Sequence, residues 1–394
     1  MKIVVLKRTI PSNATRGMLL VSARGSDEEA PSRGIQIEVR DDPTGKDLSD
    51  LQRDPDVQAA APSIPMRLIR PAKIGDPVLG APGEIAWGVR AVGADTSPRT
   101  GKGVKVAVLD TGIDRKHPAF EGIKFTVKNF TGGVPDDVQD IDGHGTHCAA
   151  TIFGRNVDGM RIGIAPGVTE AVIAKVVGEE GSTLEEIAKA TAWAYAEEAH
   201  ILSISLGIDF DSHRDSFIKQ GIPSPQATSL ALSDYGACLR LFDRLFDFMA
   251  DRYHIYRGML VVAAAGNESS RPHYRVKVAP PADAHGIISV GAVCRKEDGT
   301  YAVADFSNQG PQFCAPGVGI LSARSGGGLE SRDGTSMAAP HAAGVAALWA
   351  EAKVATASPG RFRSDLVLRD IEDSVKKIDG FDPDDIGAGL VQAP

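Results

Sequence analysis

The sequence predicts an α/β protein with a mostly parallel central sheet, preceded by a small α+β domain. From residue 103 onward, short apolar stretches alternate with helical patterns, as expected when helices cover both faces of a buried parallel sheet. The first seventy residues instead combine alternating strand patterns with one short helical stretch. A length of 394 residues suits one large domain and a smaller one.

The N-terminal part has its own pattern. Residues 3–6 and 35–39 are expected to be strands, the second with strict alternation, and residues 48–53 start a short helix. Five prolines and three glycines then lie between Pro62 and Gly83, which is typical of an exposed connector. We therefore expect an N-terminal domain over residues 1–75, a linker over 76–84 and the larger domain over 85–394.

The larger domain contains four apolar stretches that we expect to be buried strands: 104–109, 201–206, 259–265 and 286–290. Ser182 and Glu185 form a capping box for a helix that continues to residue 195. An alanine-rich helix is expected over 337–352.

Composition excludes several classes of protein. The chain is 42% hydrophobic and 24% charged, as in folded globular proteins. Its net charge of −8 disfavours a nucleic-acid partner. The apolar stretch 259–265 is far shorter than the roughly 20 residues of a membrane span, and the N-terminus lacks the apolar core of a secretory signal, so we expect a cytoplasmic protein. The cysteines are widely spaced in apolar surroundings, which indicates reduced thiols: Cys148, Cys238, Cys294 and Cys314.

Two motifs indicate acid–base chemistry. Asp110 directly follows the strand 104–109, at the sheet edge where α/β proteins collect functional groups; alone, it reads equally well as a turn residue. His144 lies between two glycines, which leave its ring uncovered for proton transfer, and we expect a helix to begin at His147. A metal site with His144, His147 and Asp142 has plausible spacing, but no HExxH motif supports it.

Two further motifs complete the set. Ser336 precedes the helix, where free N–H groups favour developing negative charge, so its hydroxyl is well placed to attack a carbonyl; the alternative is a helix cap made by Ser336 or Thr335. Asn267 follows the strand 259–265 and Gly266, and its amide can donate a hydrogen bond to an oxyanion. Alone, it would be an ordinary turn residue.

These motifs, in the order Asp110, His144, Asn267 and Ser336, resemble those of the subtilisin family of serine peptidases, the S8 subtilases. The resemblance covers residues 85–394 and implies a three-layer subtilisin-like fold. It also implies that Ser336 is the nucleophile, His144 the general base and then acid, Asp110 the group that orients the imidazole, and Asn267 an oxyanion donor.

The resemblance further implies a substrate-binding edge at Ser205, Leu206 and Gly207, which pairs with extended peptide. Glu268 lies near the primary pocket in relatives; it either favours a basic side chain or is simply solvated. The other residues implied in substrate binding are Ala265, Gly266 and Ala279.

The N-terminal domain resembles the family's propeptide, with residues 63–70 as a tail that blocks the cleft. This implies an autoprocessed zymogen whose own N-terminal domain is an intramolecular inhibitor; a permanent interaction domain is the alternative. The substrates implied are extended protein or peptide segments.

Three features depart from the family pattern. Gly207 and Asn267 are 60 residues apart, which indicates an insertion at about 209–257 that either alters specificity, binds a partner or is a surface elaboration; it includes an amphipathic helix. Ala119 stands where many members of the family carry a calcium-ligating Asp, so we expect this calcium site to be absent. The family resemblance implies no required cofactor, and calcium sites elsewhere are not excluded. Cys148 resembles a free thiol found below the active site in one branch, although a packed core residue is the simpler interpretation.

We therefore predict a serine endopeptidase of the EC 3.4.21 class. One alternative is a catalytically silent pseudo-protease that binds peptides and is regulated by its N-terminal domain. The other is metal-dependent hydrolysis through His144, His147 and Asp142.

Overall fold

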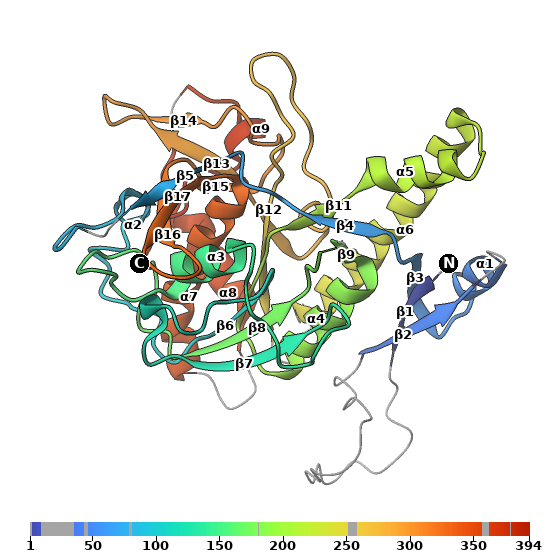
Figure 1. The fold of residues 1–394 in the computed structure, drawn as a ribbon, viewed down its shortest axis with the longest axis horizontal. Helices are drawn as coiled ribbons and strands as arrows, with labels where there is room; N and C mark the ends of the chain where they lie inside the picture. The colour runs from blue at the N-terminus through green and yellow to red at the C-terminus, as the bar shows by residue number, and fades with distance from the viewer. Residues whose placement is uncertain are drawn as a thin grey trace, which may run out of the picture.

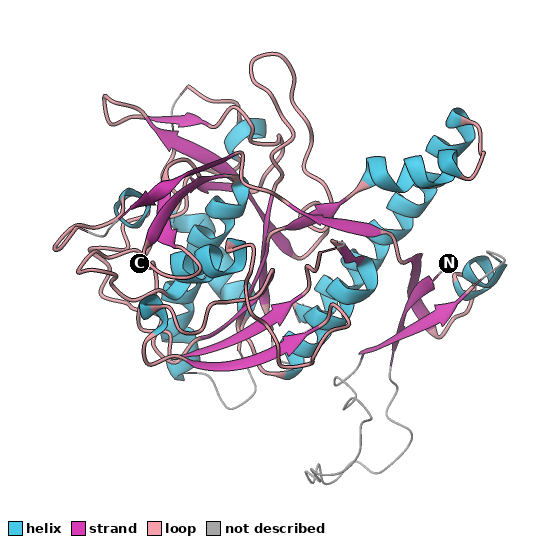
Figure 2. Ribbon diagram, in the orientation of Figure 1, coloured by secondary structure: helices cyan, strands magenta, loops and turns pink. Residues whose placement is uncertain are grey.

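The computed structural model describes residues 2–8, 35–42, 46–78, 81–179, 181–250, 258–356, 362–378 and 380–394. Its centre is an eight-stranded sheet with helices on both faces (Figures 1 and 2). The strand order is β14-β13-β12-β10-β6-β8-β7, with β15 beside β13. All neighbours are parallel except β14, which is antiparallel to β13. The predicted three-layer fold class is confirmed.

Four strands of the central sheet, β6, β10, β12 and β13, lie at the four predicted apolar stretches, and β7, β8, β14 and β15 were not predicted. The strands of this sheet are β6 Lys105–Asp110, β7 Lys124–Asn129, β8 Glu170–Lys175, β10 Ile201–Ile204, β12 Leu260–Ala264, β13 Ile287–Arg295, β14 Tyr301–Val303 and β15 Phe313–Pro316. The helices of this part are α2 Trp87–Ala91, η1 Pro118–Phe120, α3 His144–Phe153, α4 Leu184–Ala196, α5 Phe210–Lys219, α6 Ser224–Met249, α7 Thr335–Thr356, α8 Ser364–Ser374 and α9 Pro383–Ile386.

Both faces of the central strands β6, β10 and β12 are buried, which explains why these strands are almost continuously apolar. Side chains alternate along β6: Val106 and Val108 pack in the cluster that contains α3, α7 and α8. Ala107 and Leu109 pack in the opposite cluster, which contains α4 and α6. The polar residues at the strand ends are therefore the ones left for chemistry.

The N-terminal domain is a small antiparallel sheet of order β2-β1-β3 with one helix. Its elements are β1 Lys2–Arg8, β2 Ile35–Asp41, α1 Lys46–Leu51 and β3 Val57–Pro62. Alternation along β1 separates two apolar contacts. Ile3 and Val5 pack with Leu51 of α1, whereas Val4 and Leu6 join the cluster that contains α4 and α6. The domain is thus docked on the helices of the larger one.

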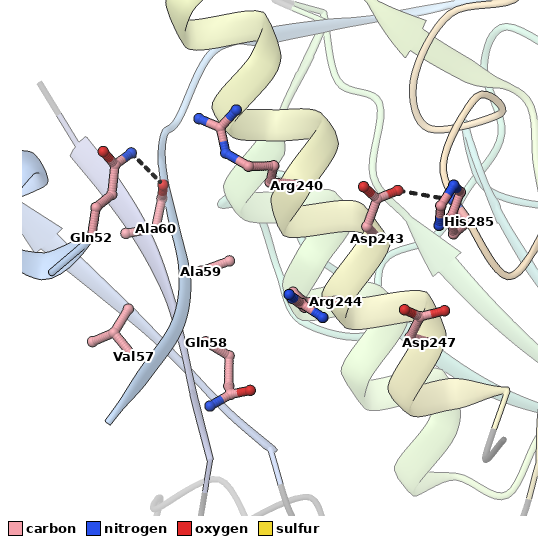
Figure 3. A pocket seen from close by; sticks show the side chains of 10 residues that line it. All are labelled: Gln52, Val57, Gln58, Ala59, Ala60, Arg240, Asp243, Arg244, Asp247 and His285. Carbon is pink, nitrogen blue, oxygen red and sulfur yellow. Dashed lines mark hydrogen bonds between the residues drawn. The ribbon is translucent and has the colours of Figure 1, made fainter. Parts of the chain in front are cut away.

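The docking contact is only partly apolar. A hollow separates β3 from the middle of α6 (Figure 3). Its α6 side carries Arg240, Asp243 and Arg244, and Asp243 accepts a hydrogen bond from the backbone N–H of His285 at 2.9 Å. Val4, Leu6 and Ala61 supply apolar contact with the larger domain, and Lys2 Nζ adds an ion pair with Glu185 of α4 at 3.1 Å.

The stretch from Pro62 to Gly83 is not the exposed connector that we expected. It contains β4 Pro65–Leu68 and β5 Lys73–Val78, each paired with strands of the larger domain. Met66, Leu68 and Ile69 are buried. Prolines are tolerated in such strands at positions where no ladder hydrogen bond is needed, so the Pro and Gly count alone misled the prediction.

Several helix starts differ from the prediction by a few residues: α1 and α7 each begin two residues earlier, so Ser336 lies inside α7 rather than before it. The capping box of α4 is formed by Thr183 and Glu186, one residue later than expected. Helix α3 begins at His144 rather than His147, after Gly143 in a left-handed conformation (φ 85°). Either neighbouring hydroxyl could cap α4 by sequence, because Ser182 and Thr183 each have a Glu three residues on.

The expected insertion contains two helices, α5 and α6, and its residues 251–257 lie outside the described part, as do residues 9–34 of the N-terminal domain and residues 79–80 of the linker. Helix α6 ends where the predicted amphipathic segment, residues 238–249, ends, but it begins 14 residues earlier, at Ser224. His213 Nε2 of α5 lies 2.8 Å from Asp234 Oδ2 of α6. Helix α5 and the adjoining end of α6 project from the body of the protein next to β4 and β11, Leu206–Ile208 (Figure 1).

All four cysteines are free thiols, as predicted. Within the ranges that the structure describes, no helix combines the length and apolar character needed to cross a bilayer.

Candidate active site

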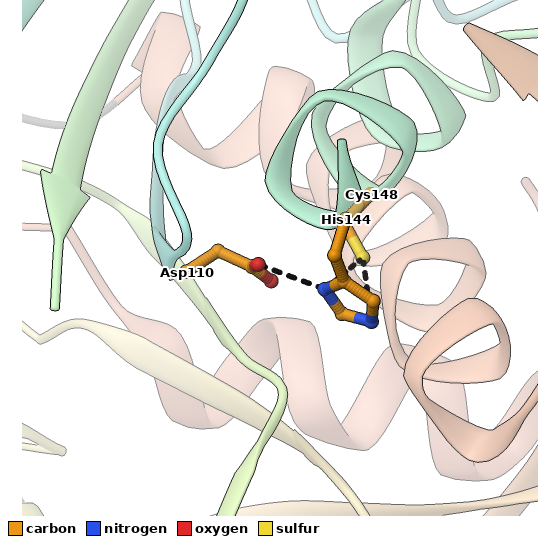
Figure 4. Close-up of side chains that lie close together, drawn as sticks. All are labelled: Asp110, His144 and Cys148. Carbon is orange, nitrogen blue, oxygen red and sulfur yellow. Dashed lines mark hydrogen bonds and ion pairs between the residues drawn. The ribbon is translucent and has the colours of Figure 1, made fainter. Parts of the chain in front are cut away.

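Asp110 and His144 form a buried pair at the carboxyl edge of the sheet. Asp110 is the last residue of β6 and His144 the first of α3. Asp110 Oδ1 lies 2.8 Å from His144 Nδ1 (Figure 4) and also accepts a hydrogen bond from the Thr111 N–H. A carboxylate in this position holds the imidazole in one orientation and directs its other nitrogen, Nε2, away from Asp110.

Glycine makes this close approach feasible. A Cβ on Gly145 would collide with the carbonyl oxygen of Gly112 and would lie 3.1 Å from Asp110 Cβ. The absence of a side chain at this position therefore lets α3 meet the end of β6. The sequence analysis gave Gly145 a different role, to leave the ring of His144 uncovered.

Asp140 connects the end of β6 with the start of α3. Its Oδ1 accepts hydrogen bonds from Thr111 Oγ1 and Gly143 N, both at 2.8 Å. Its Oδ2 accepts from Thr146 N and Thr146 Oγ1. Asp140 is 1% exposed, so all of this bonding is inside the protein. Asp140 was not predicted from the sequence, because a carboxylate close to a turn also fits ordinary capping.

The electrostatics of His144 are dominated by burial and by Asp110. Burial alone disfavours the charged imidazolium, but the Asp110 carboxylate outweighs it and holds the pKa of His144 well above its usual value. The thiol of Cys148 contacts the ring, with Sγ 3.7 Å from Nδ1, and burial raises the pKa of this thiol. Cys148 thus lies directly beneath the imidazole as a neutral group at pH 7.

Ser336 is placed at the start of α7. It is the second residue of the helix, and its side chain is fully buried. Its backbone carbonyl accepts a hydrogen bond from Cys148 Sγ at 3.2 Å. Within the described residues no hydrogen bond joins Ser336 Oγ to His144; in such sites this bond often tightens only when substrate binds.

Asn267 follows β12, and its orientation is fixed by Thr335. The N–H and Oγ1 of Thr335 both donate to Asn267 Oδ1 at 2.8 Å. The amide nitrogen is thereby directed outward, where Asn267 Nδ2 donates to the carbonyl oxygen of Arg70 at 2.8 Å. Thr335, which the sequence analysis treated only as a helix cap, is therefore the residue that aims this amide.

The chain itself occupies the site as an extended peptide. Strand β4 lies between β11 and β9, Ser182–Thr183, and is antiparallel to both. Ser205 O accepts a hydrogen bond from Ile69 N, while Leu206 and Gly207 pair with β4. After Pro71 the chain continues into β5, which pairs with β17, Leu329–Asp333, of the sheet β16-β17-β5; β16 is Ile320–Ala323. Residues 65–78 thus cross the whole site.

Comparison with known proteins agrees with this architecture. The model of the "Subtilase family" matches residues 101–371, more than half of the chain. The chain belongs to the subtilase family. It is 32% identical over 254 residues to the "Major intracellular serine protease" of Bacillus subtilis (strain 168), covering 63% of this chain and 68% of that protein. It is 35% identical over 275 residues to the "M-protease" of Shouchella clausii (strain KSM-K16), covering 67% of this chain and 59% of the relative. For the "Intracellular serine protease" of Paenibacillus polymyxa the identity is 31% over 274 residues, 67% and 72% of the two chains. This subtilase is a serine peptidase by family.

The remaining predicted binding residues of the subtilase have varied surroundings. Glu268 Oε1 lies 2.9 Å from Arg67 Nη2, on β4. Gly266 N donates to Thr335 Oγ1 and Ala265 O accepts from Asn308 Nδ2, so these two support the site through their backbones. Ala279 is half-buried, and within the described residues it makes no hydrogen bond with β4.

The three residues of the metal alternative point in different directions. Asp142 is paired with Arg70 and Arg332. His147 Nε2 lies 3.0 Å from the carbonyl oxygen of Ile320, and burial holds the pKa of His147 well below its usual value. Among the residues with described positions, the group whose ligand atoms gather within 4.8 Å of one another is Asp110, His144 and Cys148. Ala119, the position at which the resemblance implies a calcium-ligating Asp in relatives, is buried in the apolar cluster.

We predict that Gly334→Ala blocks the space shared by Ser336 and Asn267. The added carbon would lie 2.9 Å from Ser336 Oγ and 3.1 Å from Asn267 Nδ2. Labelling of Ser336 by a fluorophosphonate should slow by at least about 100-fold, the scale of losing one oxyanion donor. The matched control is Gly236→Ala, on α6, where the added carbon meets only the flexible Arg240 side chain at 3.3 Å. Equal labelling rates in the two variants would contradict the prediction.

Proposed function

We propose that the chain is an endopeptidase that hydrolyses peptide bonds through an acyl-enzyme, with Asp110, His144 and Ser336 as its triad. One observation carries the proposal. A peptide carbonyl, that of Arg70, is hydrogen-bonded to Asn267 Nδ2 at the N-terminus of the helix that bears Ser336. The arrangement is that of a substrate presented to a nucleophile, and the family membership supports it.

His144 carries the proton, and Asp110 does not take it up. His144 takes the proton of Ser336 Oγ as the oxygen attacks the carbonyl carbon, and Asp110 stabilises the imidazolium that forms. His144 then gives this proton to the leaving amine, and the acyl-enzyme remains on Ser336. Water activated by the same imidazole releases the acid product and restores Ser336.

Asn267 and the backbone N–H of Ser336 would hold the oxyanion. Replacing Asn267 by Ala removes a donor whose orientation Thr335 fixes without removing the nucleophile. Donors of this kind in subtilisins contribute about 10²–10³-fold to turnover, and we expect a loss of that size in kcat for Asn267→Ala, with KM little changed. A loss confined to KM would contradict the oxyanion role.

Activity should depend on pH through His144. As general base the imidazole must be neutral, and Asp110 raises its pKa. The protonated, inactive form therefore persists to higher pH, and kcat/KM should fall as pH drops through a value above 6.5. Asp110→Asn removes the carboxylate and leaves burial, so the acidic limb should move to lower pH while activity falls about 10⁴-fold. An unchanged limb in this variant would exclude His144 as the titrating group.

We further propose that residues 1–75 act as an intramolecular inhibitor of a zymogen. Residues 65–70 pair with the same edge that substrates would use, and Ser336 is fully buried while they are in place. A tail held by backbone pairing favours extended segments of protein or peptide as substrates. Two relatives are named intracellular proteases, which supports a cytoplasmic location.

Mass spectrometry of the full chain beside Ser336→Ala tests both proposals. We expect the wild type alone to lose an N-terminal fragment that ends between about residues 63 and 79 after incubation at neutral pH. An intact wild type whose Ser336 reacts with a fluorophosphonate would keep the peptidase and overturn the zymogen. A wild type that stays intact, and whose Ser336 remains unreactive after residues 1–75 are removed by limited proteolysis, would favour the alternative of a silent peptide-binding pseudo-protease.

A further inference from the structure

Two arginines of the chain segment in the site lie on carboxylates of the larger domain. Arg67 Nη2 is 2.9 Å from Glu268 Oε1, and Arg67 Nη1 is 3.8 Å from Asp209 Oδ1. Three residues later, Arg70 Nη1 is 3.3 Å from Asp142 Oδ2. The carboxylates come from separate loops, so a single local charge run does not explain them.

Asp142 belongs to a built cluster that remains anionic. Arg332 Nη2 donates to the backbone carbonyl of Asp142, and Arg332 Nη1 lies 3.9 Å from its Oδ1. The same guanidinium is 2.6 Å from Glu330 Oε1, with both side chains largely buried. Two carboxylates share one guanidinium, which leaves a net charge of −1. The exposed edge of Asp142 therefore offers a place for one more cation, two residues before His144.

The second anionic position lies beside β11. Glu268 Oε2 accepts a hydrogen bond from Asn308 Nδ2 at 2.7 Å, and Asp209 Oδ1 accepts from Ser212 N at the start of α5. Both carboxylates are thus held in place by neutral donors. Among the residues that the structure describes, Arg67 is the one cation paired with either of them.

The residues beside the two arginines are apolar and buried. Met66, Leu68 and Ile69 are 2%, 6% and 6% exposed, and Ile69 lies over Gly207, where an added carbon would meet its side chain at 3.7 Å. The cleft thus receives a pattern of two cations separated by two apolar side chains.

We propose that Asp142 and the pair Glu268 and Asp209 are two anionic subsites. They select extended substrates that carry two basic side chains separated by two apolar residues. The inhibitory tail uses the same subsites through Arg70 and Arg67. This inference rests on the proposed peptidase function and names its substrate class. Ion pairs with exposed partners are modest, so we expect about two- to fivefold from each subsite, decreasing with salt.

Substrate selection is tested with four aminocoumarin amides of acetyl-Met-Arg-Leu-Ile-Arg, in which either or both arginines are replaced by Gln. We expect the doubly basic peptide to have about tenfold higher kcat/KM than the double-Gln peptide at low salt, and nearly equal values at 0.5 M salt. Asp142→Asn should abolish the preference at the second arginine only, and Glu268→Gln at the first only. The control Asp298→Asn, on the exposed loop 296–300, should keep both preferences.

Binding of the tail to the same subsites is measured without catalysis in the full-length Ser336→Ala chain. Hydrogen exchange of residues 65–70 is followed in Arg67→Gln, Glu268→Gln and the double variant. Either single substitution removes the ion pair, so the double variant cannot lose it a second time. We therefore expect the protection factors of the double variant to differ about two- to fivefold from the product of the two single effects. Additive effects here, or equal kcat/KM for the four peptides, would overturn the inference while fluorophosphonate labelling of Ser336 left the peptidase proposal standing. Absence of labelling in the wild type after residues 1–75 have been removed would overturn the peptidase proposal instead.

Discussion

The site depends on three neighbouring strands that end at the same edge of the sheet. In the order β12-β10-β6 all three run parallel and in register. The residues at their carboxyl ends, Asn267, Ser205 and Asp110, are therefore brought together although they are far apart in the chain. Helices α3 and α7 begin at this edge and add His144 and Ser336. A shift of one strand by a single residue would turn its terminal side chains to the other face.

That the four proposed site residues lie at strand ends and helix starts could be predicted, because each lies in a short local pattern: a polar residue directly after an apolar strand, or at the start of a helix. Their supports could not be predicted in the same way. Asp140 holds Thr111, 29 residues away, and Thr335 holds Asn267, 68 residues away. Neither contact leaves a local signal, since a hydroxyl or carboxylate near a turn also fits ordinary capping.

The connector shows the opposite limitation. Proline and glycine content reports how freely a segment bends in isolation, and residues 62–83 are rich in both. Their conformation is decided by the edges of β11, β9 and β17, whose unpaired N–H and C=O groups need partners. Strands of four and six residues are too short for their sequence periodicity to predict this pairing. The fold class was predictable from the long alternating pattern. The occupant of the cleft, residues 63–70, was expected from the resemblance to the family's propeptide, whereas the pairing of β4 and β5 with the larger domain was not.

Pairing of β5 with β17 means that the segment is held on both sides of Ser336. A cut near the carbonyl of Arg70 would change the connectivity of the chain and leave the cleft filled, because β1 and β4 still bind the larger domain. What the cut removes is the covalent tether, and with it the high effective concentration of the tail. Before the cut, reclosure is independent of protein concentration; afterwards it requires a second molecule to collide. The release of such an enzyme is therefore governed by dilution and by destruction of the freed fragment, and the protein can remain silent after processing for as long as that fragment stays intact.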